Sequence, residues 1–281
     1  MDPNLKTISS LVERMVKKKR KPKETVLLKE ALGLKSREVI SLVGAGGKTT
    51  LMFRLAKELI QGGKRVITTT TTKILEPAPD ETECLFVESD EEKLKEWVRG
   101  HVSDYKHMTL ARERLTTGKL KGISSLLALD LWNLDPVDYL IIEADGAAGR
   151  PVKAPREGEP VIPPNTTLVV AMLGVEGVGM ELNGENVFQA ELISNITGIP
   201  LGRPLTEEAL SVLVTHPQGI FKGTPSSSRV IVFLNKTDIP EGLHKAKRVA
   251  EKILEKKNRQ IERVVLGQLK KDPPVVEVMF P

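Results

Sequence analysis

The chain has 281 residues, of which 40% are hydrophobic, and this is enough to bury the core of one large α/β domain. Lys and Arg outnumber Asp and Glu by 42 to 37, a net charge of +5, and aromatic residues make up 4%. The single cysteine, Cys84, excludes a disulfide framework or a thiolate metal cluster within one chain. No apolar run is long enough to span a membrane, and the N-terminus lacks a signal-peptide core. We therefore expect a cytoplasmic protein.

Positive charge is concentrated at the N-terminus. Residues 1–36 contain ten Lys or Arg and four Asp or Glu, so the rest of the chain is close to neutral. Apolar residues recur at helical spacing from Leu5 to Val16, and Pro22 ends the pattern. This predicts a basic helical segment over residues 1–35. Nucleic-acid binding is disfavoured, because no interleaved aromatics, zinc-finger spacing or reading helix accompany the lysines.

Downstream of this segment, predicted strands alternate with predicted helices. Strands are expected at 38–43, 66–69, 84–87, 139–144, 168–173, 230–234, 263–266 and 275–279. Helices are expected at 24–33, 49–61, 90–98, 124–132, 185–197, 206–215 and 241–257, whereas residues 101–122 give no clear pattern. The continuous apolar strands are typical of parallel strands covered on both faces. We expect an α/β fold, a doubly wound, mostly parallel sheet of P-loop NTPase type with flanking helices, over residues 36–281. A helical insertion is expected at about 178–228.

A glycine-rich loop follows the first of these strands and precedes a helix, which is where a phosphate cradle belongs. Glycines let backbone N–H groups approach phosphates, and the helix N-terminus adds the positive end of its dipole. Lys48 is expected to reach the β- and γ-phosphates, and the Thr49 hydroxyl to bind magnesium. The usual spacing would put a glycine where Leu42 stands, so the loop is a shortened variant. The predicted nucleotide-binding residues of this loop are Gly44, Ala45, Gly46, Gly47, Lys48, Thr49 and Thr50.

A second site is predicted where an apolar strand ends in carboxylates. Residues 138–142 lead into Glu143 and Asp145, which are two positions apart and should point to one face. P-loop enzymes place an acid here to hold the magnesium shell or to polarise the attacking water. We expect Glu143 in the water shell of the metal and Asp145 as a second contact or a switch residue. Together with Lys48 they form the predicted catalytic set, and together with Thr49 the predicted metal site.

Two further polar groups lie near these motifs in the sequence. Thr68–Thr72 follow the second strand and fit either a magnesium or γ-phosphate ligand or a hydroxyl-rich turn. Arg150 and Lys153 follow the acidic strand end, and as exposed loop charges they either steady an anion or are inert.

A base-reading motif is predicted after the strand at 230–234. Asn235-Lys236-Thr237-Asp238 matches the guanine-selective pattern of GTPases, in which one carboxylate accepts from the guanine N1–H and N2–H₂ groups. Adenine lacks this donor pair, so a buried carboxylate disfavours it. We expect Asn235 to bond the N7 side of guanine and order the loop, Lys236 to cover the base, and Asp238 to select it. The same four residue types are also common in ordinary turns that bind no nucleotide.

With these motifs assembled, the sequence resembles the accessory proteins of selenium-dependent molybdenum hydroxylases (YqeC type). The matching runs are Leu42–Thr50, Val66–Thr70, Lys119–Ile123, Ile142–Pro151, Lys153–Pro155, His216–Gly219 and Asn235–Asp238. The resemblance spans roughly residues 36 to 270 and implies a role in maturing such hydroxylases, with the enzyme or its cofactor-assembly proteins as partners. More distantly, Glu143 resembles the acidic third motif of metallocentre-assembly GTPases. Those proteins often carry a Cys-rich metal-handling motif, and this chain has none.

Three functions fit these observations. The first is a magnesium-dependent NTPase, GTP-preferring, that helps assemble a metal- or selenium-containing enzyme. The second is an ATP-dependent kinase or ligase acting on a small molecule, because the compact loop also resembles the ATP loop of Mur-type peptide ligases. The third, a nucleic-acid-associated protein, would depend on the basic N-terminus and show strong salt dependence.

Overall fold

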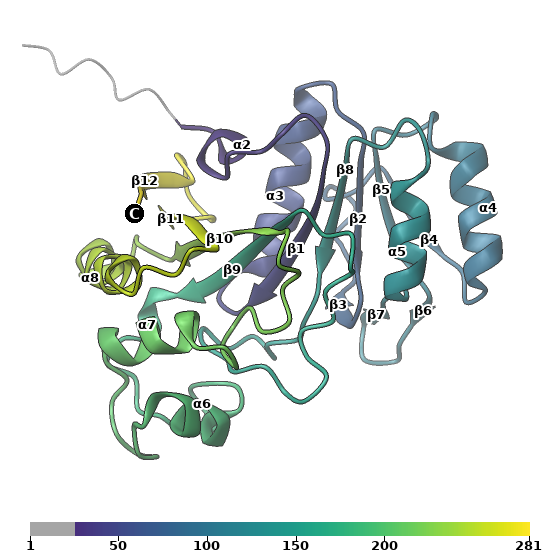
Figure 1. Ribbon diagram of the computed structural model, residues 1–281. Coiled ribbons are helices and arrows are strands. Elements are labelled where there is room, and N and C mark those ends of the chain that lie inside the picture. The colour runs from purple at the N-terminus through teal and green to yellow at the C-terminus, as the bar shows by residue number, and fades with distance from the viewer. Residues whose placement is uncertain (1–25) are drawn as a thin grey trace, which may run out of the picture.

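The structure is a computed structural model, and it describes residues 26–281 (Figure 1). Most of the basic segment expected at 1–35 lies outside the described residues. Within them, its last part forms a short helix, α2 (Leu28–Ala31). No helix in the described part is both long and apolar enough to cross a bilayer.

The centre of the molecule is a nine-stranded sheet in the order β12-β11-β10-β9-β1-β8-β2-β5-β4. The strands are β1 (Glu38–Gly44), β2 (Val66–Thr70), β4 (Cys84–Val87), β5 (His107–Ala111), β8 (Tyr139–Glu143), β9 (Leu168–Gly174), β10 (Arg229–Asn235), β11 (Ile261–Gly267) and β12 (Val275–Met279). All neighbours pair in parallel except β12, which is antiparallel to β11 at one edge. The expected α/β class is confirmed.

Helices cover both faces of this sheet (Figure 1). They are α3 (Lys48–Gln61), α4 (Glu91–His101), α5 (Ser125–Trp132), α6 (Ala190–Thr197), α7 (Glu207–Thr215), α8 (Gly242–Glu255) and the 3₁₀ turn η1 (Val175–Gly177). Successive side chains of a strand point to opposite faces of the sheet. In β9, Val170 packs on the face covered by α3, and Val169 and Ala171 pack on the face covered by α7 and α8. This burial on both sides explains why the strands read as continuous apolar runs.

The order in which strands are added to the sheet reverses at β1. From β1 the chain passes over to β2 on one side, and only later reaches β9 on the other. In open α/β sheets, ligands bind outside the carboxyl ends of the strands at such a switch point. The glycine-rich loop leaves β1 at this place.

Residues 101–122, which had no clear sequence pattern, contain β5 and two strands of a small second sheet. That sheet is antiparallel, has the order β3-β7-β6, and consists of β3 (Lys73–Leu75), β6 (Glu113–Arg114) and β7 (Lys119–Lys121). Strands of two or three residues are too short to show an alternating pattern, so the sequence did not reveal them. The helix expected at 185–197 begins only at Ala190.

The connection between β9 and β10 carries α6 and α7, with α7 packed along α8. Apolar residues of α7 such as Leu210 and Leu213 join the core beneath β9 and β10. The helices expected after residue 178 therefore contribute to the same hydrophobic core as the sheet.

A buried histidine predicts how stability depends on pH. His107 in β5 is 2% exposed, and its Nε2 lies 3.0 Å from Thr68 Oγ1. Burial lowers the pKa of His107 to about 4. The unfolded chain, with an ordinary pKa of about 6.5, takes up this proton first, so stability is lost as pH falls from about 6.5 to about 4. The expected loss is about 3 kcal/mol.

Urea unfolding at pH 7 and at pH 4.5 measures this loss. His107→Gln should show a smaller loss than the wild type, and the exposed His244→Gln should match the wild type. Equal pH dependence in all three proteins would refute the assignment.

Candidate nucleotide-binding site

The glycine-rich loop is held closely against neighbouring strands. Gly46 (φ +84°) and Gly47 (φ +133°) adopt conformations that disfavour side chains. A Cβ on Gly47 would come within 2.5 Å of Asn235 Nδ2, and one on Gly46 would collide with the backbone of Gly174. The loop therefore needs glycine at both positions, and its backbone stays open on the cavity side.

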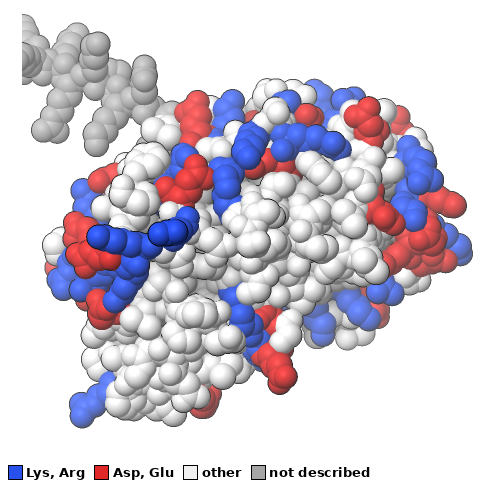
Figure 2. All heavy atoms as spheres, viewed as in Figure 1, with Lys and Arg blue, Asp and Glu red and all other residues white. Residues whose placement is uncertain are grey.

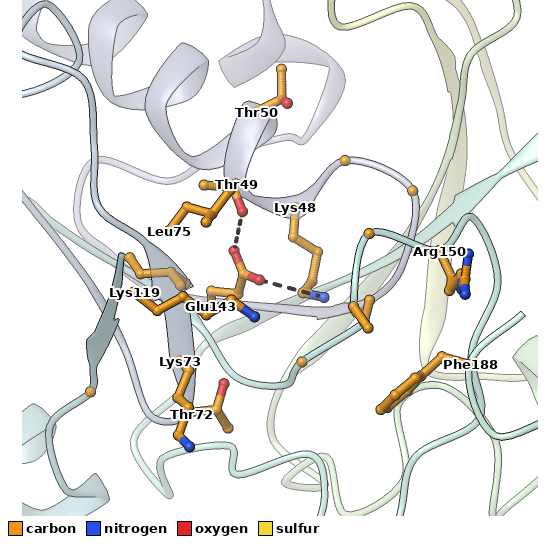
Figure 3. Close-up of a pocket in the computed structure, with 18 of the residues that line it drawn as sticks. Lys48, Thr49, Thr50, Thr72, Lys73, Leu75, Lys119, Glu143, Arg150 and Phe188 are labelled. Atoms are coloured by element: carbon orange, nitrogen blue, oxygen red, sulfur yellow. Dashed lines mark hydrogen bonds and ion pairs between the residues drawn. The ribbon is translucent and has the colours of Figure 1, made fainter. Parts of the chain in front are cut away.

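Lys48 and Thr49 begin α3 and point at Glu143, the last residue of β8 (Figure 3). Lys48 Nζ donates to Gly44 O at 2.6 Å and lies 3.0 Å from Asp145 Oδ1 and 3.6 Å from Glu143 Oε1. Thr49 Oγ1 donates to Glu143 Oε2 at 2.7 Å. Pairing of β1 with β8 puts Leu42 opposite Glu143, so the loop and the acidic strand end necessarily meet.

The charges in this cluster shift each other's protonation. Burial raises the pKa of Glu143, while Lys48 and the Thr49 hydroxyl oppose part of that rise. Burial alone would lower the pKa of Lys48, but the charges of Asp145 and Glu143 outweigh it and raise the pKa. Lys48 is therefore held as a cation, and Glu143 takes up a proton more readily than an exposed glutamate.

Asp145 and Lys153 form a second, fully buried ion pair. Asp145 Oδ2 accepts from Gly44 N at 2.9 Å and lies 3.0 Å from Lys153 Nζ. Lys153 is 0% exposed and also donates to Gly146 O at 2.7 Å and Glu159 Oε2 at 2.9 Å. The interpretation of Lys153 as an exposed loop charge was wrong, because it lies inside the protein. Asp145 is thus tied to the strand end of the glycine loop.

The base-reading motif lies beside the same loop. Asn235 Nδ2 donates to Gly46 O at 2.8 Å, and Asn235 Oδ1 accepts from Leu269 N at 3.0 Å. Asn235 therefore links the glycine loop to the loop after β11. Lys236, at φ +68°, forms an ion pair with Glu176, and Asp238 lies 3.2 Å from Lys271 at the edge of the site.

Gly46–Thr50, Glu143, Asn235, Lys236 and Asp238 line one cavity of about 1190 Å³, whereas Gly44, Asp145 and Lys153 are not among its lining residues. Ligand pockets are typically roughly 300 to 1,000 Å³, so this one exceeds the usual range for a single small molecule. Its other walls are Thr71–Leu75, Lys119, residues 121–124, and the loop of Gly146–Arg150 with Arg156 and Phe188. Arg156 lies over the Phe188 ring, 4.6 Å from its centroid.

The cavity is strongly cationic. Nine Lys and Arg side chains and three acidic ones line it. Figure 2 shows Lys and Arg atoms along the lower edge of the molecule, in the region of β3 and β7 in Figure 1. Such a cavity favours an anionic ligand.

The residues at the carboxylate end fit a magnesium ion that is bound together with a nucleotide. Mg²⁺ prefers hard oxygen donors and usually takes one or two protein groups plus phosphate oxygens. The Thr49 hydroxyl and the Glu143 carboxylate lie side by side on the cavity wall. No cluster of three or more His, Cys, Asp or Glu suited to a metal occurs in the part of the chain that the structure describes.

The structure brings Lys48, Thr49, Glu143 and Asp145 together, and it places Asn235 against the glycine loop, with Lys236 and Asp238 lining the same cavity. Sequence reasoning missed Glu159 and Phe188 and the cavity-lining role of Lys73 and Lys119. The last two lie in the short strands β3 and β7 that the sequence did not reveal.

Comparison with known proteins places the chain in a family. The YqeC protein family model matches residues 40–191. The YqeC protein of Escherichia coli (strain K12) is 33% identical over 237 residues, which are 84% of this chain and 90% of that protein. Among solved structures, the signal recognition particle 54 kDa protein of Aeropyrum pernix K1, in complex with GDP, is 16% identical with a TM-score of 0.31. That match covers 95% of this chain but 48% of the other, so this chain spans about half its length. From the family match and the Escherichia coli relative, the chain belongs to the YqeC family.

Proposed function

We propose that this protein binds a nucleoside triphosphate with Mg²⁺ in the loop Gly44–Thr50 and hydrolyses it, with a preference for GTP. The arrangement of Lys48, Thr49 and Glu143 at the start of α3 carries the proposal. A cation, a hydroxyl and a carboxylate converge there beside open backbone N–H groups, which is the set that phosphate and magnesium require.

The chemistry follows from the contacts of each side chain. Lys48 would leave Gly44 O and the carboxylates to neutralise the β- and γ-phosphates. Thr49 and Glu143 would hold the magnesium ion, which neutralises charge developing on the phosphates. Through the water shell of that ion, the Glu143 carboxylate would orient the attacking water. Asp145, held by Lys153 and Gly44 N, would hold Lys48 beside the loop until the nucleotide binds.

We further propose that this activity serves the maturation of a selenium-dependent molybdenum hydroxylase, with that enzyme or its cofactor-assembly proteins as partners. The support is the resemblance carried by the run Ile142–Pro151 and the neighbouring motifs. The test is hydroxylase activity in cells that lack this protein. Wild-type protein should restore activity and the Lys48→Ala variant should not, whereas full activity without the protein would refute the role.

A second candidate is an ATP-dependent kinase or ligase acting on a small molecule. The observation that favours it is the size of the cavity, which continues beyond the groups that would hold a triphosphate. The identity of the base separates the two candidates.

Asp238 provides the test of base preference. Asp238→Ala removes the acceptor for two guanine donors, and we expect GTP to bind about 100-fold more weakly, about 3 kcal/mol, with ATP unchanged. Titration of fluorescent GTP and ATP derivatives measures both affinities. Lys271→Ala, which removes only the ion-pair partner of Asp238, should retain GTP preference.

A complementary variant sharpens this test. Xanthine carries a carbonyl where guanine has its N2 amino group, so the amide of Asp238→Asn can donate to it. This variant should bind xanthosine triphosphate better than GTP. Tighter binding of ATP than GTP by the wild type, or unchanged GTP binding in both Asp238 variants, would remove the GTPase assignment.

A further inference from the structure

The cavity extends well past the place where a nucleotide would end. If the base contacts Asp238 after β10 and the phosphates contact Lys48 after β1, the nucleotide runs along the sheet edge from β10 to β1. Past the phosphates the cavity continues in the same direction, from β1 over β8 and β2, to the small sheet. Two strand spacings correspond to about 10 Å, which is room for a second small molecule.

One face of the small sheet forms the wall at that end. Lys73 pairs opposite Lys121, and Leu75 opposite Lys119, so these four side chains share one face of the β3–β7 ladder, and all four line the cavity. The alternate residues, Ile74 and Leu120, point into the core. Like charges directly opposite each other in a sheet are destabilising, so Lys73 and Lys121 face each other at a cost that a bound anion would remove.

Several cations around this space lack acidic partners. Among residues 26–281, neither Lys73, Lys119 nor Arg150 forms an ion pair with a carboxylate, although Lys121 lies 3.5 Å from Glu113. Figure 3 shows Lys73 and Lys119 on one side of the cavity and Arg150 on the other, with Lys48 and Glu143 between them. Lys73 and Lys119 are therefore the cations that face an anion placed beyond the terminal phosphate, at the small-sheet end.

We propose that this end of the cavity is a second binding site, which takes a small organic molecule carrying a phosphate group while a nucleotide occupies the glycine loop. The inference rests on the proposed nucleotide function. A phosphate monoester supplies nearly two negative charges and three acceptor oxygens, which match the ammonium groups of Lys73 and Lys119. Leu75 is 62% exposed between the lysines, and it offers apolar surface to the carbon part of the ligand.

The test uses the full chain saturated with a non-hydrolysable GTP analogue and Mg²⁺, with phenyl phosphate as the probe in titration calorimetry. The wild type should bind phenyl phosphate saturably, more weakly at high salt, and more tightly than inorganic phosphate. The Lys73→Ala/Lys119→Ala variant should bind the probe at least about 10-fold more weakly.

The control is Lys57→Ala/Lys93→Ala, which removes two exposed lysines away from the cavity and the same total charge. It should bind the probe within about 2-fold of the wild type, and both double variants should bind the nucleotide normally. If the nucleotide binds but phenyl phosphate does not, or binds equally to both double variants, the second site is wrong. If the nucleotide itself does not bind to the wild type, the proposed function has failed instead.

Discussion

Lys48→Ala is expected to weaken magnesium-dependent nucleotide binding by at least about 100-fold and to remove hydrolysis. The ammonium group forms charge-assisted hydrogen bonds to phosphates, each worth about 1.5–3 kcal/mol when one partner is charged. In the absence of these bonds the backbone of the loop alone would have to hold the triphosphate. Calorimetric titration with GTP and ATP, alongside phosphate release, measures the loss.

Folding must be checked in this variant, because Lys48 also offsets the charges of Glu143 and Asp145. Circular dichroism at the titration temperature serves this purpose, and Lys57→Ala on the exposed side of α3 is the matched control. Thr49→Val leaves the lysine in place and should weaken magnesium dependence specifically. Hydrolysis at the wild-type rate in Lys48→Ala would overturn the assignment of the phosphate site.

Lys153→Met is expected to lower the free energy of unfolding by about 3–5 kcal/mol, the largest stability effect we predict for a single substitution. Methionine keeps most of the volume but leaves Asp145 with only Lys48 as a cation, and it removes the cation that pairs with Glu159. Asp145 is 0% exposed, so water cannot replace the lost ion pair. Chemical denaturation followed by circular dichroism measures the change.

Two comparisons make this result specific. Arg150→Met removes a nearby cation that has no acidic partner among the described residues, and it should change stability by at most about 0.5 kcal/mol. Asp145→Asn combined with Lys153→Met removes both charges and should recover part of the loss. Equal unfolding free energies for Lys153→Met and Arg150→Met would show that the buried pair is not stabilising.

Much of the fold was readable from the sequence because the central strands are buried on both faces. A run such as Leu168–Leu173 has no polar interruption, and glycine or proline marks its ends. The glycine loop and the acidic strand end were also readable, because each has a fixed spacing from a strand. Their proximity follows from the pairing of β1 with β8.

The remaining parts depend on contacts between distant segments. Lys153 looks like an ordinary loop lysine in the sequence, and only its position between Asp145 and Glu159 shows that it is buried. Lys73 and Lys119 are 46 positions apart, and the pairing of β3 with β7 brings them to one wall. No local pattern in strands of three residues encodes that pairing.

Asn235 has a consequence for how the two ends of the site influence one another. Its side chain bonds Gly46 O with one atom and Leu269 N with another, so the loops at the two ends of the site share a single crosslink. A ligand fragment that orders one loop also restrains the second loop through this crosslink, so the second loop loses less conformational entropy when its own fragment binds. By thermodynamic reciprocity, each fragment increases the affinity for the other by the same factor. Guanosine and pyrophosphate, supplied as separate molecules, should therefore bind cooperatively, and the cooperativity should disappear in Asn235→Ala.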